Sequence, residues 1–487
     1  MLVTALHAQT KIFKEVGEEI STQMKEITQD NALVGYLAFT KLEKASADSF
    51  NYRITIMDEN LNDIGTVNFR QEKIDLQGVS LENDVLCLGY VQSSTKGILT
   101  NKDARNAYRN GIQGQILVQF ISLAGKILRT FTSKVDLIAG VTPAGGAFSV
   151  KMNVDFYLKY GMQVRNIAKT GFCVFYGDAN RKDILLFDMD GNKVRDRRVT
   201  ADAANYYLLA SSANYYLLTK NNDEAPEGGF KIYTYSIKDS TAEYKYDLKD
   251  KQGDELKVLS FDNDPVTGKA FLAGCIINAD RTKDFITAKD FSRDPYLGVF
   301  TITLGNTNKD IQVNYSYWYN GKIPGITTDG LWSDKSFYVR YMIAFRDYKG
   351  NTVFAGTAME EKKLLGIAKY RLADAVFVLQ GDGGKLKLDN NITCDDSKYF
   401  GPASSIIELD KKSYYRVTNS DIKSNYVIID DEKNTYIYNV NSQKIMRTIQ
   451  HKEGSLRTGV YPAKEGHVMV AEYNKKQKYT RFSIEAL

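Results

Sequence analysis

The sequence predicts an all-β protein, a β-propeller of about seven blades, with six to eight possible. Three observations lead to this class. Tyrosine and phenylalanine are abundant, at 32 and 23 residues, and both favour pleated strands. Short apolar runs alternate with turns rich in Gly, Asn and Asp along most of the chain. The same order of strands and turns then recurs, which indicates a repeat fold.

Each repeat has an apolar strand, a polar connection, a second apolar strand, a tight turn and a more polar outer strand. The clearest copy has FCVFY at 172–176, ILLFDM at 184–189, the turn DGNK, and VRDRRV at 194–199. Apolar strands suit cover by neighbouring blades, whereas the charges of 193–198 suit a sheet edge. Seven repeats would average roughly 65 residues each, which is longer than a blade of the compact propeller families. The blades are therefore expected to carry insertions.

The predicted propeller occupies residues 32–487 as a single domain, because no linker rich in Pro or Ser interrupts it. The alternative is two β-sandwich domains joined near Thr200 or Asp250. A repeated hexapeptide, ANYYLL, occurs at 204–209 and again at 213–218. It predicts a hairpin of two near-identical strands, and exposed tyrosines that stack on a ligand are the functional alternative.

The first 31 residues are predicted to precede the propeller. Apolar residues at 12, 13, 16, 20, 24 and 27 follow helical spacing, which predicts a short helix over residues 10–30. The alternative for the segment 10–31 is an extended arm. Residues 1–9 resemble the end of a signal peptide, with an apolar stretch that ends at Ala8–Gln9. An ordinary N-terminal strand is the alternative. A leader would place the protein outside the cytoplasm.

Composition excludes several classes of protein. Four cysteines are too few for a disulfide framework, and Cys87, Cys173 and Cys275 lie in apolar runs typical of buried free thiols. The sequence has no run of 18 apolar residues, so no transmembrane helix is expected. A net charge of +5 does not indicate a nucleic acid partner.

No catalytic motif is evident. The three histidines have no nearby Ser–Asp or Cys pattern, and neither a GxSxG elbow nor a phosphate loop occurs. Aspartates on turns could serve a carbohydrate-active enzyme, which needs two carboxylates facing one another. The candidate pairs are Asp188/Asp190, Asp262/Asp264, Asp395/Asp396 and Asp430/Asp431.

Two further patterns indicate binding sites. Asp188, Asp190 and Asn192 place oxygen ligands at alternate positions of a glycine-containing loop, which predicts a calcium site. The same letters also form a common hairpin turn. The densest aromatic cluster contains Tyr315, Tyr317, Trp318 and Tyr319, which predicts either a ligand-binding rim or core packing. Alternation along a strand would place the three tyrosines on one face and Trp318 on the other.

The leader-like start and the phrases FDNDPVTGKAFLAG and DILLFDMDGNK resemble large, uncharacterised secreted β-propeller-like proteins of Bacteroidota. This resemblance implies export to the periplasm or cell surface, and it transfers no catalytic residue. We therefore expect a non-enzymatic binding or scaffold protein of the cell envelope, with a protein or glycan partner at one propeller face. The alternative is a carbohydrate-active propeller enzyme, a glycoside hydrolase or lyase, that uses loop carboxylates. A repeated subunit of an assembly is a third possibility.

Overall fold

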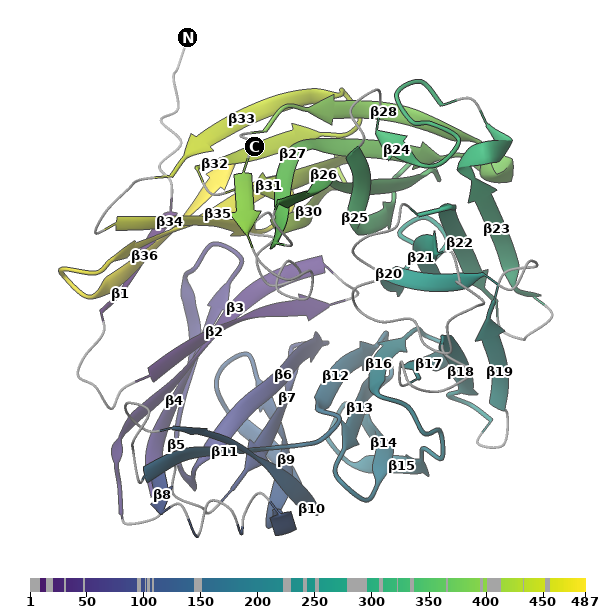
Figure 1. Cartoon of the computed structure of the whole chain (residues 1–487). Helices are drawn as coiled ribbons and strands as arrows, with labels where there is room; N and C mark the ends of the chain where they lie inside the picture. The colour runs from purple at the N-terminus through teal and green to yellow at the C-terminus, as the bar shows by residue number, and fades with distance from the viewer. Residues whose placement is uncertain are drawn as a thin grey trace. The chain divides into compact units, whose positions relative to one another are not determined.

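The structure, a computed structural model, is built from β-strands that pair in antiparallel meanders (Figure 1). Its described residues form eight sheets of at least four strands each. The chain is therefore an all-β protein with eight propeller-type blades. The structure describes residues 9–14, 21–29, 32–46, 49–93, 98–100, 102, 106, 109–143, 151–221, 229–239, 243–249, 254–277, 296–305, 310–321, 323–332, 337–364, 367–394, 397–400, 413–431, 433–451 and 456–487.

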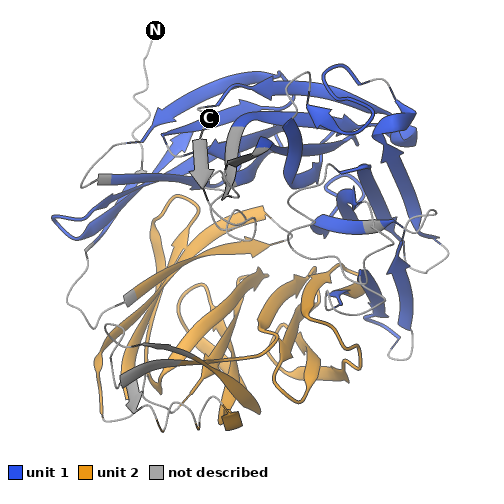
Figure 2. Ribbon diagram, in the orientation of Figure 1, with its two compact units in different colours: residues 1–14, 218–487 blue, residues 15–217 orange. Residues whose placement is uncertain are grey.

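The chain divides into two compact units, shown in different colours in Figure 2. One is Glu15–Leu217, and the other combines Met1–Lys14 with Leu218–Leu487. The division falls inside a strand, β17 (Asn214–Lys220), and not in a linker. Within most sheets the strands follow one another along the chain, as they do in propeller blades. A single domain over 32–487 stays a prediction.

Three sheets lie wholly within Glu15–Leu217. The first contains β2 (Ser21–Gln29), β3 (Ala32–Lys44), β4 (Ser49–Asp58) and β5 (Asp63–Glu72). The second contains, in spatial order, β6 (Ile74–Glu82), β7 (Val85–Gln92), β9 (Ile112–Ser122), β10 (Ile127–Pro143), β11 (Lys151–Tyr157) and β8 (Ile98–Thr100). The third contains β12 (Met162–Ile167), β13 (Gly171–Gly177), β14 (Lys182–Asp188) and β15 (Lys193–Arg198).

The fourth sheet explains the blade count. It contains β16 (Asn205–Ala210), β17, β18 (Phe230–Ser236) and β19 (Glu243–Leu248). The predicted ANYYLL hairpin is confirmed, because β16 and β17 are neighbours in this sheet. The sequence pattern treated the hairpin as a local duplication and missed that it begins a complete sheet. The observed eight sheets are therefore one more than the central estimate of seven, within the predicted range.

Four sheets follow in the C-terminal part of the chain. The first contains β20 (Glu255–Asn263), β21 (Ala270–Ile277), β22 (Gly298–Leu304) and β23 (Gln312–Tyr317), followed by the 3-10 turn η2 (Trp318–Asn320). The second contains β24 (Leu331–Trp332), β25 (Phe337–Arg346), β26 (Thr352–Leu364), β27 (Ile367–Gln380), β28 (Leu386–Ile392) and β29 (Ser397–Phe400), with η4 (Asp382–Gly384) between β27 and β28. The third contains β30 (Ser413–Asn419), β31 (Ser424–Asp430), β32 (Asn434–Asn439) and β33 (Lys444–Gln450). The last contains β34 (Leu456–Pro462), β35 (His467–Asn474), β36 (Tyr479–Ala486) and β1 (Gln9–Lys14).

The helix predicted over residues 10–30 is wrong. The described residues of this segment form β1 and β2, and residues 15–20 lie outside the description. β1 pairs antiparallel with β36, where Phe13 packs edge-to-face on Phe482 at 5.7 Å. Ile12, which a helical core face would bury, is 54% exposed. Strand pairing therefore overrides the helical spacing, as tertiary contacts commonly override local propensity.

The hydrophobic cores lie between successive sheets of each unit. One cluster joins side chains of β3, β4, β7 and β9, and another joins β21, β25, β26 and β27. Within the third sheet, every residue of β13 is buried, whereas the outer strand β15 is largely exposed. This gradient confirms the predicted order from apolar inner strands to a charged edge.

All four cysteines are buried free thiols, which confirms the prediction for Cys87, Cys173 and Cys275. Cys394, although its sequence context is polar, is also buried. Among the described residues there is no helix with the length and apolar character needed to cross a bilayer.

Candidate functional site

Aspartates at the tight turns bind the backbone of their own turn. Asp188 Oδ1 accepts hydrogen bonds from the N–H groups of Asp190 at 2.9 Å and Asn192 at 2.8 Å. Its Oδ2 accepts the Asn192 side-chain amide at 2.9 Å. Asp58 and Asp347 make the same three contacts in their own turns. The repeated arrangement closes the turn, as Asx turns do.

The predicted calcium ligands Asp188, Asp190 and Asn192 thus share one such turn. Burial raises the pKa of Asp188, but hydrogen bonds from Asn192 and from backbone N–H groups outweigh it and hold that pKa below its usual value. In the part of the chain that the structure describes, no group of three or more His, Cys, Asp or Glu could hold a metal ion. A calcium ion would have to compete with three N–H donors for the Asp188 carboxylate. Calcium binding stays a prediction.

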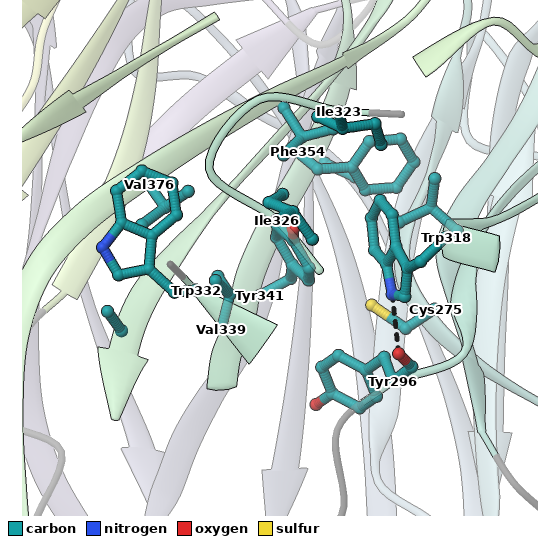
Figure 3. Close-up of a cluster of buried hydrophobic side chains, with 14 of the residues drawn as sticks. Cys275, Tyr296, Trp318, Ile323, Ile326, Trp332, Val339, Tyr341, Phe354 and Val376 are labelled. Carbon is teal, nitrogen blue, oxygen red and sulfur yellow. Dashed lines mark hydrogen bonds between the residues drawn. The ribbon is translucent and has the colours of Figure 1, made fainter. Parts of the chain in front are cut away.

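A 3-10 turn divides the predicted aromatic cluster. β23 ends at Tyr317 and η2 begins at Trp318, so strand alternation stops there. Trp318 is buried, and its indole N–H donates to the Tyr296 carbonyl oxygen at 2.6 Å (Figure 3). Tyr319 is 50% exposed, and its ring centroid lies 5.0 Å from that of Tyr317. Tyr315 is half-buried on β23. The structure thus separates Trp318, a core residue, from the exposed Tyr319, at which ligand binding stays a prediction.

One predicted acidic pair, Asp262/Asp264, does not present two open carboxylates. Asp264 is buried, and its Oδ1 accepts two backbone N–H groups of its own turn. Its Oδ2 lies 3.2 Å from the guanidinium of Arg346. Asp395 and Asp396 fall outside the described residues.

The Asp430/Asp431 pair divides two roles between its members. Asp431 is 3% exposed, and its Oδ1 accepts the N–H groups of Lys433 at 2.9 Å and Asn434 at 2.7 Å. Asp431 is therefore the turn residue, in the position that Asp264 fills elsewhere. Asp430 ends β31 one residue earlier, so its carboxylate is available for other partners.

Asp430 contacts Thr435 and His451. The Thr435 hydroxyl donates to Asp430 Oδ1, and His451 Nε2 lies 3.1 Å from the same oxygen. His451 Nε2 also lies 2.8 Å from Thr435 Oγ. Because the Thr435 proton is committed to Asp430, the N–H at His451 Nε2 is the donor that Thr435 Oγ and Asp430 Oδ1 share. Asp430 and Thr435 both contact Nε2 of His451, whereas a serine-protease-like relay places the acid and the hydroxyl on opposite imidazole nitrogens.

Two tyrosines from the first strands of two successive sheets lie near this carboxylate, and Tyr461 interacts with it electrostatically. Tyr415 on β30 and Tyr461 on β34 have ring centroids 6.2 Å apart and planes tilted by 54°. Tyr461 is 40% exposed. Gly459 makes room for it, because a Cβ there would meet the Tyr461 hydroxyl at 3.0 Å. We call Tyr415, Asp430, Thr435, His451 and Tyr461 the tyrosine–aspartate cluster.

The electrostatics show that the members of the cluster interact. Burial raises the pKa of the Asp430 carboxyl, and hydrogen bonds from Thr435 and His451 only partly offset this. Burial also raises the pKa of Tyr461, and the neighbouring Tyr415 and Asp430 add to the effect. Tyr461 therefore stays a neutral phenol at physiological pH. The side chain of Asp430 remains 24% exposed.

Sequence reasoning found only part of this cluster. It named Asp430 as a member of an acidic pair, and it found no Ser–Asp or Cys pattern near any of the three histidines, of which His451 is one. Tyr415 and Tyr461 belong to different sheets, and no local pattern connects them. One sequence signal was available. The segment IIDDEKN contains two consecutive aspartates, whereas a single aspartate is enough to close the turn.

No protein-family model matches the chain, and no curated protein matches it. Several solved structures are similar. The Dos1 propeller is 7% identical, covers 97% of this chain and 94% of its own, and gives a TM-score of 0.44. The dihydro-heme d1 dehydrogenase NirN, in complex with DHE, is 13% identical, covers 89% and 71%, and gives a TM-score of 0.42. Apo AztD from Citrobacter koseri is 9% identical, covers 88% and 86%, and gives a TM-score of 0.36. At these values the similarity carries no argument about function, and the resemblance to Bacteroidota proteins stays a prediction.

Proposed function

We propose that this protein is a non-enzymatic binding or scaffold protein that binds a glycan at the tyrosine–aspartate cluster. One observation carries the proposal: the partly exposed Asp430 carboxylate, which does not close its turn, interacts electrostatically with Tyr461, whose ring centroid lies 6.2 Å from that of Tyr415. The propeller fold is compatible with such a role, because its loops and strand ends present binding residues on a rigid scaffold.

The chemistry of the cluster matches that of a sugar. A pyranose ring has an apolar C–H face that packs on aromatic rings, and hydroxyl groups that donate hydrogen bonds at its edges. Tyr461 is 40% exposed, and the Tyr415 ring lies beside it from the first strand of another sheet. The Asp430 carboxylate accepts hydroxyl donors, since an ionised carboxylate has about four acceptor sites.

The cluster gives less support to the enzyme alternative. Glycoside hydrolysis requires two carboxyl groups on either side of the scissile bond. Asp430 is accessible, but its neighbour Asp431 is 3% exposed and binds its own turn. Within this cluster Asp430 is accessible and Asp431 is not, so the arrangement favours glycan binding over glycan hydrolysis.

The cellular context is part of the same proposal. An envelope glycan as the partner depends on the export expected from residues 1–9, whose apolar stretch ends at Ala8–Gln9. A protein partner in the envelope is the outcome to consider if no glycan binds.

A glycan microarray tests the proposal. The wild-type protein, Tyr461→Ala and the matched control Tyr319→Ala would be compared on bacterial and plant glycans. Tyr319 is a suitable control because it is also an exposed tyrosine with a tyrosine neighbour. We expect Tyr461→Ala to weaken binding by roughly fivefold to a hundredfold, taking for the sugar the about 1–3 kcal/mol that a base stacked on an aromatic side chain contributes.

Two results would contradict the proposal. One is that no glycan binds to the wild-type protein. The other is that Tyr319→Ala weakens binding while Tyr461→Ala leaves it unchanged, which would move the site to the aromatic segment predicted from sequence.

A further inference from the structure

Three hairpins of the described chain place apolar residues between basic residues, directly after the turn. The segments are 126–129, 193–195 and 444–447, at the start of β10, β15 and β33. The first reads KILR, the second KVR and the third KIMR. The same order of residue types thus recurs in three different sheets.

A β-bulge exposes the apolar residues of these segments. The register of β9 and β10 shifts between Ile127 and Arg129, so Leu128 is the additional residue. Val194 and Met446 are the additional residues of equivalent shifts in the other two hairpins. Leu128, Val194 and Met446 are 42%, 63% and 51% exposed. Ile127 is exposed as well, at 38%, whereas a regular strand on a core buries every second side chain.

The first two segments lie next to each other within one compact unit. Arg129 Nε donates to the Asp190 carbonyl oxygen, in the turn before β15, at 3.3 Å. Lys193 Nζ lies 5.9 Å from the centroid of the Phe131 ring on β10. These contacts join the exposed starts of β10 and β15 into one stretch of surface.

We call residues 126–129 and 193–195 the basic–apolar edge. Four cations flank its apolar residues: Lys126, Arg129, Lys193 and Arg195. Besides Asp188, which closes its turn, the neighbouring acids are the exposed Asp190 and Asp196. Asp196 pairs with Lys193 at 2.7 Å. The positive charge is therefore concentrated around the apolar pair at the start of β10.

The shape and charge of this edge match a lipid interface. Its apolar side chains project singly or in pairs from turns, and a rigid protein partner would need a separate pocket for each. A lipid interface buries such side chains at the boundary between headgroups and acyl chains without preformed pockets. Anionic headgroups also attract the flanking lysine and arginine side chains.

We infer that the basic–apolar edge binds the surface of an anionic lipid membrane. Ile127, Leu128 and Val194 insert into the interface, and the flanking cations contact the headgroup phosphates. The contact is peripheral and requires no membrane-spanning segment. The inference uses no residue of the tyrosine–aspartate cluster, so it does not depend on the proposed function.

Vesicle flotation tests this inference. The full-length protein would be floated with vesicles of phosphatidylcholine alone, and with vesicles of phosphatidylcholine mixed with phosphatidylglycerol. We expect binding to the mixed vesicles only, and weaker binding as the salt concentration rises. Failure to bind the mixed vesicles, or equal binding to both kinds, would overturn the inference.

A double variant locates the contact. Ile127→Ser combined with Leu128→Ser removes two apolar side chains and keeps the cations. We expect it to lower binding to the mixed vesicles roughly tenfold or more, because less apolar surface leaves water. Val266→Ser is the matched control, since Val266 is 57% exposed in a turn outside this edge. Unchanged binding of the double variant, or an equal loss in the control, would contradict the assignment.

A second readout preserves the apolar character of the edge. The natural tryptophans, Trp318 and Trp332, are buried, so an indole introduced by Leu128→Trp reports on its own surroundings. We expect brominated lipid in the mixed vesicles to quench this indole, and to leave the indole introduced by Val266→Trp unquenched. Flotation of Leu128→Trp with the vesicles but without quenching would show that another surface makes the contact.

Discussion

The turns after β14 and β31 both begin with aspartate, but they use it differently. At Asp188 a single carboxylate closes the turn, and both of its oxygens accept N–H donors. At the second turn Asp431 closes the turn, and the preceding Asp430 is left to bind Thr435 and His451. One additional aspartate thus separates the structural role of Asp431 from the role in glycan binding that we propose for Asp430.

The four turns also differ in the residue that precedes the turn aspartate. Elsewhere this position holds Phe187, Asn263 or Arg346, before Asp188, Asp264 and Asp347 respectively. An acid at this position therefore sets the β31 turn apart from those three. A carboxylate that is not needed to close its turn is the kind of group that a binding site can use.

The largest expected effect is on stability, at Asp431. Asp431→Ala removes a buried acceptor of two backbone N–H groups, so we expect a loss of about 2–3 kcal/mol in unfolding free energy. Asp430→Asn is expected to change it by less than about 0.5 kcal/mol, because its partners can bind the amide oxygen. Urea unfolding of both variants measures the difference. Equal losses would mean that the two aspartates share one structural role.

The next effect is on glycan binding. Asp430→Asn keeps the shape of the side chain but removes its charge, and a hydrogen bond to a charged group is stronger than one to a neutral group. We expect about tenfold weaker binding of the tightest array glycan. Asp188→Asn is the matched control and is expected to bind normally. Titration calorimetry gives both constants, and equal affinities in the two variants would remove Asp430 from the site.

A smaller effect on stability is expected at Asp188. Asp188→Ala loses three hydrogen bonds, but the turn is more exposed and water can replace the carboxylate. We expect a loss of about 1 kcal/mol, below that for Asp431→Ala. The same urea experiment decides the order, and a larger loss at Asp188 would contradict it.

The smallest effect is a difference in pH dependence. The lowered pKa of Asp188 stabilises the folded state above the unfolded value of about 4, and this contribution is lost as pH falls through the folded value. The raised pKa of Asp430 acts in the opposite direction, because stability falls as pH rises from about 4 through the folded value. Thermal midpoints of Asp188→Asn and Asp430→Asn against wild type, from about pH 3 to about pH 7, should therefore diverge in opposite directions. Parallel curves would show that the two carboxylates have similar environments.

The sequence predicted the fold well where the pattern was local. Strand alternation, the turn after Met189 and the charged edge at 193–198 all follow from neighbouring residues. The helix over 10–30 failed because β36, more than four hundred residues away, provides the partner for β1. The sequence analysis did not predict the sheet that begins with β16, because it interpreted the ANYYLL repeat as an isolated hairpin.

The site was harder to predict, for a physical reason. Asp430 was one of several turn acids with the same local appearance. Its distinction depends on Tyr461, His451 and Thr435, which strand pairing and the packing of two sheets bring together. Such contacts between segments that are distant in sequence leave no periodic pattern.

Hydroxyl-radical footprinting tests the central claim most directly. The full-length protein would be oxidised with and without the tightest-binding array glycan, and the modification of each tyrosine would be measured. The account predicts protection of Tyr461 and unchanged oxidation of Tyr319. Protection of Tyr319 with unchanged oxidation of Tyr461 would contradict it.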